Sequence, residues 1–282
     1  MTRDRRGFTL IELLVVTVLG ALVVGAALQV LITNRRAYTA QTATISGQQS
    51  TRMAVEVLFA ELREVSPSGG DILAMSGDSI RVRLMRKFSI ICATDFTVAD
   101  PTVTIIDTLR TASSMVLQAG ANRFEAGDSV FIWADNDPDL DSDDVWISAE
   151  VDATDTTVTC PQDGAGATEL EFTGLLAVFL ADSVGIGAPV RSFQEFTFGT
   201  STMNGDVYLS RRRGGGDMIP ITGPLQPSNG LEFVYRDSLG AVTATPADVS
   251  QIEIVIRTGS QVLGPLGQMV QDSVEVLIHT RG

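Results

Sequence analysis

Residues 7–32 read GFTLIELLVVTVLGALVVGAALQVLI, and this stretch decides the architecture of the N-terminal part of the chain. Its last 20 residues, Leu13–Ile32, contain no charged side chain. A helix needs about 20 apolar residues to cross a hydrocarbon core of roughly 30 Å, because it rises about 1.5 Å per residue. The stretch is also longer than the apolar part of a secretory signal peptide, which has about 7–15 residues. It therefore predicts one transmembrane helix near the N-terminus.

A single carboxylate, Glu12, stands just before this uncharged stretch. An ionised side chain in lipid costs about 2.5–3.5 kcal/mol, so a cationic partner for Glu12 is expected. No Lys or Arg lies within the helical turn that follows it. The partner is therefore expected to come from outside the following part of the helix.

The segment from Arg5 to Leu14, RRGFTLIELL, resembles the class III leader and N-terminal helix of type IV pilins and type II secretion pseudopilins. The resemblance implies that a prepilin peptidase removes residues 1–7 by cutting after Gly7, and that the new amine of Phe8 is methylated. It also implies that this amine, usually on a neighbouring subunit, neutralises Glu12 as each subunit enters a filament. The alternative is an ordinary membrane anchor that carries an unrelated glutamate.

The helix is expected to continue into water and to span about residues 8–66. In its second half, apolar residues three or four positions apart form one stripe: Val55, Leu58, Leu62 and Val65. We expect this stripe to pack on the chain's own β-sheet, because the strict repeat is too short to favour a coiled-coil partner. The sequence SPSGG at 66–70 ends the helical pattern.

The remaining segment, 67–282, has the period-2 alternation of β-strands. The alternating stretches are 79–84, 130–133, 190–198, 231–235, 252–256 and 274–278. Turn signals separate several of them: Asn204-Gly205, Arg213-Gly214-Gly215-Gly216 and Asn229-Gly230. The predicted fold class is α+β, in which a long N-terminal helix, transmembrane over about residues 13–32, packs on an antiparallel β-sheet body. Residues from about 90 to 187 exceed a minimal pilin body and predict an inserted β-rich subdomain.

The C-terminal part resembles the minor pilins of the PilW kind and the J-type minor pseudopilins of type II secretion. The likeness lies in the strand-turn GLEFVYRDSLG (230–240) and in the strand within VSQIEIVIRTGS (249–260). It implies a minor subunit, held in the bacterial inner membrane with its body outside the cytoplasm until it enters a pilus or pseudopilus filament. The implied partners are other pilin or pseudopilin subunits, the prepilin peptidase and an inner-membrane assembly platform. A pilus and a type II secretion system remain alternatives, as does an anchored binding protein that does not polymerise.

Two cysteines, Cys92 and Cys160, are too few for a disulfide framework and lack CxxC spacing. For a body outside the cytoplasm we expect a bridge between them, and two separate buried thiols are the alternative.

The chain is acidic, with 34 Asp and Glu against 20 Lys and Arg and a net charge of −14. Residues 1–7 carry +2, so their removal takes the net charge from −14 to −16. A body with this charge repels nucleic acid and anionic lipid headgroups at long range, so nucleic acid is not an expected partner.

An acidic run at 135–144 offers carboxylates at alternate positions, as the start of an EF-hand loop does: Asp135, Asp137, Asp139 and Asp141. Leu140 stands where that loop needs a glycine, and Trp146 where it needs a glutamate. A solvated acidic loop is the preferred interpretation, and a calcium site of another kind is the alternative. No other cofactor is expected.

Two further features of the sequence are an arginine run and a single histidine. Arg211-Arg212-Arg213 is interpreted as a hairpin end with solvated arginines, the alternative being a basic tip that contacts phosphate or an acidic face. His279, the single histidine of the chain, lies in a strand pattern without an accompanying catalytic motif. We therefore predict no enzymatic activity.

Overall fold

The computed structural model describes residues 9–97, 100–110, 116–118, 123–135, 139, 144–173, 183–263 and 269–281. These contain the α-helix α1 (Leu10–Leu62), the 3-10 helix η1 (Pro246–Asp248) and β-strands. The strands are β1 (Ile72–Met75), β2 (Ile80–Asp95), β3 (Thr102–Ile106), β4 (Thr108–Arg110), β5 (Val116–Gln118), β6 (Ser129–Ala134), β7 (Val145–Glu150), β8 (Ala153–Asp155), β9 (Ala167–Glu171), β10 (Pro189–Met203), β11 (Asp206–Arg213), β12 (Ile219–Leu225), β13 (Leu231–Arg236), β14 (Gln251–Leu263) and β15 (Met269–His279).

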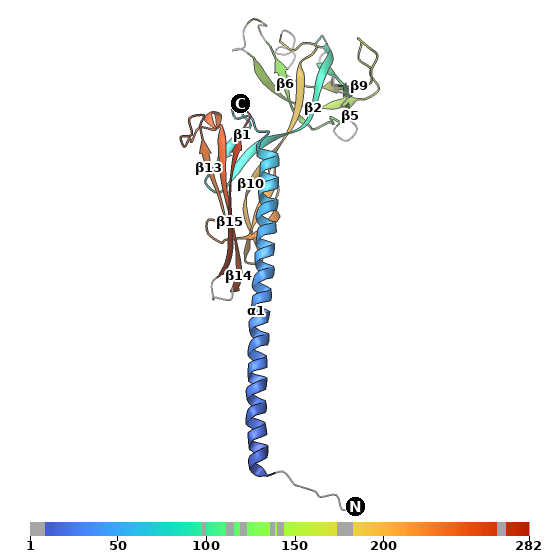
Figure 1. Ribbon diagram of the computed structural model, residues 1–282. Helices are drawn as coiled ribbons and strands as arrows, with labels where there is room; N and C mark the ends of the chain where they lie inside the picture. Colours follow the sequence, from blue (N-terminus) through green and yellow to red (C-terminus); the bar gives the residue numbers. More distant parts are fainter. Residues whose placement is uncertain are drawn as a thin grey trace, which may run out of the picture.

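The first half of α1 extends away from the rest of the molecule (Figure 1), and the C-terminal half packs on β12, β14 and β15. The buried residues of α1 all belong to the C-terminal half: Ala40, Ser50, Thr51, Ala54, Leu58 and Leu62. Leu58, Leu62 and Val65 of the predicted stripe are fully buried in the same core as the strands. The predicted α+β fold, with the helix packed on an antiparallel sheet, is confirmed.

The helix ends at Leu62, a few residues before the predicted end at about 66. Ser66 precedes Pro67, and the ring of a proline disfavours helical backbone at the residue before it. The backbone N–H of Ser66 instead donates to Oδ2 of Asp71 at 3.0 Å, and the N–H of Asp71 donates back to the carbonyl of Ser66 at 3.1 Å. This reciprocal contact turns the chain from α1 into β1.

Most of the described strands form one antiparallel sheet in the order β13-β14-β12-β11-β10-β2-β3-β9-β8. In addition, β1 pairs with β2, β15 with β14, and β6 with both β10 and β7, while β4 and β5 form a separate pair. The Asn204-Gly205 turn signal is confirmed: these residues have φ of 54° and 90° and join β10 to β11. Positive φ at both positions matches the twist of the strands that the turn connects.

The long strands β2 and β10 each pass through two hydrophobic cores. The lower core lies between α1 and the sheet, and the upper core is built from residues between Ile91 and Val190. We call residues 91–190 the upper lobe; β6 and β9 of this lobe lie beyond the C-terminal end of α1 in Figure 1. The predicted limits of an inserted subdomain, about 90 and 187, stay a prediction.

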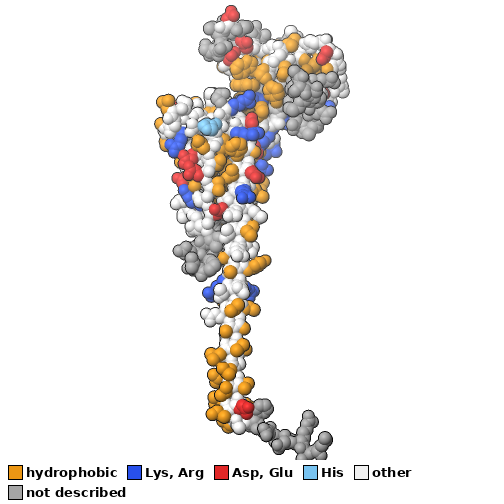
Figure 2. All heavy atoms as spheres, viewed as in Figure 1, with side chains coloured by type: hydrophobic (Ala, Val, Ile, Leu, Met, Phe, Trp, Pro, Cys, Tyr) orange, Lys and Arg blue, Asp and Glu red, His pale blue; other side chains and the backbone are white. Residues whose placement is uncertain are grey.

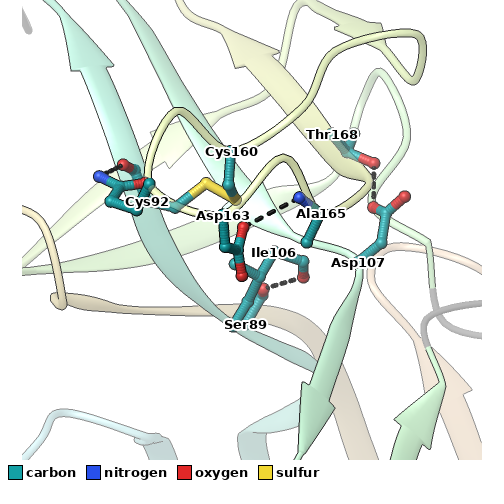
Figure 3. Close-up of a disulfide and its surroundings, with 9 residues drawn as sticks. Ser89, Cys92, Ile106, Asp107, Cys160, Asp163, Ala165 and Thr168 are labelled. Carbon is teal, nitrogen blue, oxygen red and sulfur yellow. Dashed lines mark hydrogen bonds between the residues drawn. A yellow bond between two sulfur atoms is a disulfide. The ribbon is translucent and has the colours of Figure 1, made fainter.

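A disulfide joins Cys92 of β2 to Cys160 in the loop between β8 and β9 (Figure 3). The two Cα atoms are 5.6 Å apart, and the bridge spans 68 residues of sequence. Both cysteines are buried and pack with Ala167. The side-chain amide of Gln162 donates to the carbonyl oxygen of Cys92 at 2.6 Å, which holds the loop on the strand.

An ion pair links the turn after α1 to β10, next to the upper lobe. Arg191 of β10 lies 3.3 Å from Asp71, and the two side chains are only 12% and 4% exposed. The guanidinium of Arg191 also lies over the rings of Phe131 (5.0 Å) and Trp146 (4.6 Å). Burial raises the pKa of the Asp71 carboxyl, and hydrogen bonds from Ser66 and Arg191 oppose that rise. The post-helix turn, the sheet and the β6–β7 hairpin are thus joined by one arginine.

Replacing both cysteines with serine is expected to destabilise the protein by about 4 kcal/mol, because a closed loop of this length restricts the unfolded chain. Denaturant unfolding of the detergent-solubilised full chain measures the difference. Reduced wild-type protein is the matched control and should behave like the variant. Equal stability of the variant and the oxidised wild type would contradict this account.

Replacing Arg191 with methionine is expected to cost about 3–5 kcal/mol near neutral pH, because Asp71 is left as an unpaired buried charge. A raised pKa means that the folded protein binds the Asp71 proton more tightly than the unfolded chain, whose value is near 3.8. The part of the cost that comes from the Asp71 charge therefore appears as pH rises through the raised folded value and disappears below about pH 3.8, while the loss of the contacts with Phe131 and Trp146 remains at every pH. Unfolding free energies of variant and wild type at several pH values test this.

The control is Arg52→Met at an exposed position of α1, which should change stability little at any pH. An Arg191→Met deficit that grew as the pH fell would contradict the assigned role of Asp71.

Candidate assembly site at the start of the helix

The helix begins with a capping box made by Thr9 and Glu12. Thr9 is the extended N-cap residue, with φ −77° and ψ 151°. Its hydroxyl oxygen accepts from the N–H of Glu12 at 3.3 Å, and Oε2 of Glu12 accepts from the N–H of Thr9 at 3.5 Å. These contacts hold the carboxylate beside the first turn, where the helix dipole favours negative charge.

Sequence reasoning singled out Glu12 but missed Thr9. The signal was present, because Thr followed three residues later by Glu just before an apolar run is the pattern of a capping box.

The surface around Glu12 is apolar and uncovered in the isolated chain. The large apolar side chains from Leu10 to Ile32 are each 48–85% exposed, and Figure 2 shows them along the free half of the helix. In the described part of the chain, α1 alone is long and apolar enough to cross a membrane, judged by length and composition. Its most apolar 18-residue window has a mean hydropathy of 2.5 and no buried residue. This surface therefore needs lipid or other apolar helices to cover it.

No cation of the described residues is close enough to pair with Glu12. The next positive charge along α1 is Arg35, 23 residues further, which corresponds to about 35 Å along a helix. Gly7 and Phe8, the predicted processing residues, lie outside the described residues. A partner for Glu12 must therefore come from the segment before Thr9 or from another molecule.

The predicted calcium ligands fall only partly within the described residues. Asp135 and Asp139 are described, while Asp137 and Asp141 lie outside them. Asp135 is exposed, and its backbone N–H donates to the carbonyl of Ser183 at 2.9 Å. Within the described ranges, no group of three or more His, Cys, Asp or Glu is arranged to hold a metal ion. Calcium binding stays a prediction.

The arginine run and His279 both lie at the ends of strands of the sheet. Arg211, Arg212 and Arg213 are the last three residues of β11, directly before the turn at 214–216. Arg211 and Arg213 are exposed, whereas Arg212 is half-buried. His279 is exposed and ends β15.

Comparison with known proteins gives one result for this site. A family model described as the prokaryotic N-terminal methylation motif matches residues 2–28. No curated protein and no solved structure matches the chain. The matched segment contains the basic leader, the capping box and much of the apolar stretch. Together with the mostly β body, it suggests a structural rather than an enzymatic role. The match and the long apolar helix support a type IV pilin-like protein that is anchored in a membrane and processed at a prepilin-type N-terminus.

Proposed function

We propose that this chain is a minor pilin or pseudopilin subunit that is cut after Gly7, methylated on the amine of Phe8 and assembled into a helical filament. The observation that carries the proposal is the carboxylate of Glu12, held by its cap at the start of an apolar helix without a cation among the described residues nearby. Cleavage creates an ammonium group one residue before Thr9. The positive charge of this ammonium group can pair with the carboxylate of Glu12.

Pairing between subunits explains why such a costly charge is useful. A carboxylate in an apolar environment is unfavourable until it is paired, so docking on the amine of a neighbouring subunit stabilises the assembled state. Because the pair forms at one position along the helix, it also sets the axial register of neighbouring subunits. The exposed apolar half of α1 can be covered by lipid before assembly and by other helices afterwards, since both are apolar.

Features of the β-sheet body support the proposal that this is a minor subunit. The second core, in the upper lobe, supports an inserted subdomain at about 90–187. The GLEFVYRDSLG strand-turn contains β13, which pairs with the following strand, β14. The disulfide supports a location outside the cytoplasm, where such bridges persist. Because type II secretion pseudopilins share these features, the filament is either a pilus or a secretion pseudopilus.

The N-terminus of the protein from native membranes is expected to be N-methyl-Phe8. Intact mass and peptide sequencing measure it directly. In the control, Gly7→Val should keep residues 1–7, because the peptidase of this family cuts after a glycine. Wild-type protein that retained the leader in cells with an active prepilin peptidase would contradict the proposal.

Replacing Glu12 with alanine is expected to leave cleavage intact and to reduce incorporation into filaments by more than about tenfold, since a buried charge pair is lost. Quantitative blotting of sheared filaments against membrane fractions measures the ratio. Glu56→Ala, a change of the same kind at an exposed position of α1, should assemble normally. Equal incorporation of variant and wild type would contradict the role of Glu12. If both proteins stayed in the membrane fraction with their function unchanged, an anchored binding protein that does not polymerise would be favoured.

A further inference from the structure

A groove lined by arginines lies beside the last turn of α1. Its volume is about 460 Å³, and it is lined by Glu61, Arg86, Gln194, Phe196, Arg211, Arg213 and Ile219. We call these residues the arginine groove. Lys and Arg side chains gather at this level of the molecule, between the upper lobe and the lower sheet, in Figure 2. Three arginines against one glutamate make the groove positive within a chain whose net charge is −14.

One of the three arginines is already committed to the fold. Arg86 makes two hydrogen bonds to Glu61, at 2.9 and 3.2 Å, and its guanidinium lies 4.7 Å from the centre of the Phe196 ring. This pair joins β2 to the last turn of α1. Phe196 is only 7% exposed and is one of the residues that line the groove.

The other two arginines have no carboxylate partner among the described residues. Arg211 lies over the Phe196 ring at 5.7 Å. Arg213 also lines a second pocket, together with Asp128 and Glu195. Asp128, however, pairs with Lys87 at 2.6 Å, and Glu195 pairs with arginines of β2. The charges of Arg211 and Arg213 are therefore available to another molecule.

The strand geometry fixes how these two guanidinium groups are presented. Arg211 and Arg213 pair in register with Phe198 and Phe196, so both side chains are on the sheet face that carries α1. Positions two apart on a strand are about 7 Å apart, which is also the spacing of alternate side chains in an extended peptide. Ile219, 62% exposed, adds an apolar rim. The groove thus matches two carboxylates separated by one residue, with an apolar contact at the edge.

We propose that the arginine groove binds a short acidic segment of a neighbouring subunit, in which two carboxylates are separated by one residue. The inference rests on the proposed function, because a neighbouring subunit is present only if the chain assembles. Nucleic acid fits less well. The described lining offers two unpaired arginines beside Glu61 and the exposed Ile219, whereas a nucleic acid presents a phosphate at every nucleotide.

Binding of an acidic peptide to the full chain in detergent micelles tests the groove without any need for filaments. The probe is a labelled peptide with the sequence ADNDPDLDSDD, taken from residues 134–144 because its aspartates alternate. The expected result is a dissociation constant below about 1 mM that weakens with added salt. The same peptide with every aspartate changed to asparagine should not bind.

Substitutions identify the binding surface. Arg211→Gln and Arg213→Gln should each weaken binding about tenfold, as expected for the loss of a charge-assisted hydrogen bond. Arg212→Gln is the matched control, since it removes the same charge between the two positions but on the opposite face of β11. It should change binding by less than about twofold.

Several outcomes would overturn the inference. These are the absence of peptide binding, an equal loss for all three arginine variants, or tighter binding of a single-stranded oligonucleotide through Arg211 and Arg213. The last outcome would make nucleic acid the partner. Failure of this test leaves Phe8 processing and the role of Glu12 untouched. Failure of the processing test, in turn, would show in the N-terminal mass and not in peptide binding.

Discussion

The C-terminal half of α1 packs on β12, β14 and β15, and this contact connects the membrane end of the protein to its body. At its lower end the contact is made by small and polar residues. Gly47 lies so close to the sheet that a Cβ there would be 3.1 Å from the hydroxyl of Thr258, and Ser50 donates to the carbonyl of Gly223 at 2.9 Å. Towards the end of the helix, Leu58 and Leu62 fill the lower core. Helix and body therefore form one packed unit.

The two halves of α1 differ in how much of their surface the body covers. The body covers one face of the C-terminal half, while the apolar first half is left without any cover from the chain itself. Lipid and other helices are the two environments that suit such a surface. Glu12 marks the start of the uncovered half, and the helix continues from it without a break into the attached body.

Charge is distributed just as unevenly in the body. An acidic chain concentrates arginines around the junction between the lower sheet and the upper lobe, and they serve in two ways. Arg191 and Arg86 pair with Asp71 and Glu61 and hold the end of α1 to the sheet. Arg211 and Arg213, on a neighbouring strand, have no such partner among the described residues. Arginines that pair with a carboxylate thus stabilise the fold, whereas arginines without such a partner are available to bind another molecule.

Features that depend on local pattern could be predicted from the amino-acid sequence. The uncharged stretch at 13–32, the carboxylate of Glu12, the stripe ending in Leu62 and the Asn204-Gly205 turn follow from composition, helical spacing and backbone preference over a few residues. The early end of α1 was less predictable, because it depends on a contact between Ser66 and Asp71 as well as on Pro67.

Tertiary structure decided everything that joins distant segments. Nothing in the local pattern shows that Arg191 meets Asp71, 120 residues away, or that its guanidinium lies over the rings of Phe131 and Trp146. Nor does the RRR motif show which arginines share a face with Phe196. These contacts depend on strand order and register, and register is set by the packing of the whole sheet on α1, which no short stretch of sequence contains.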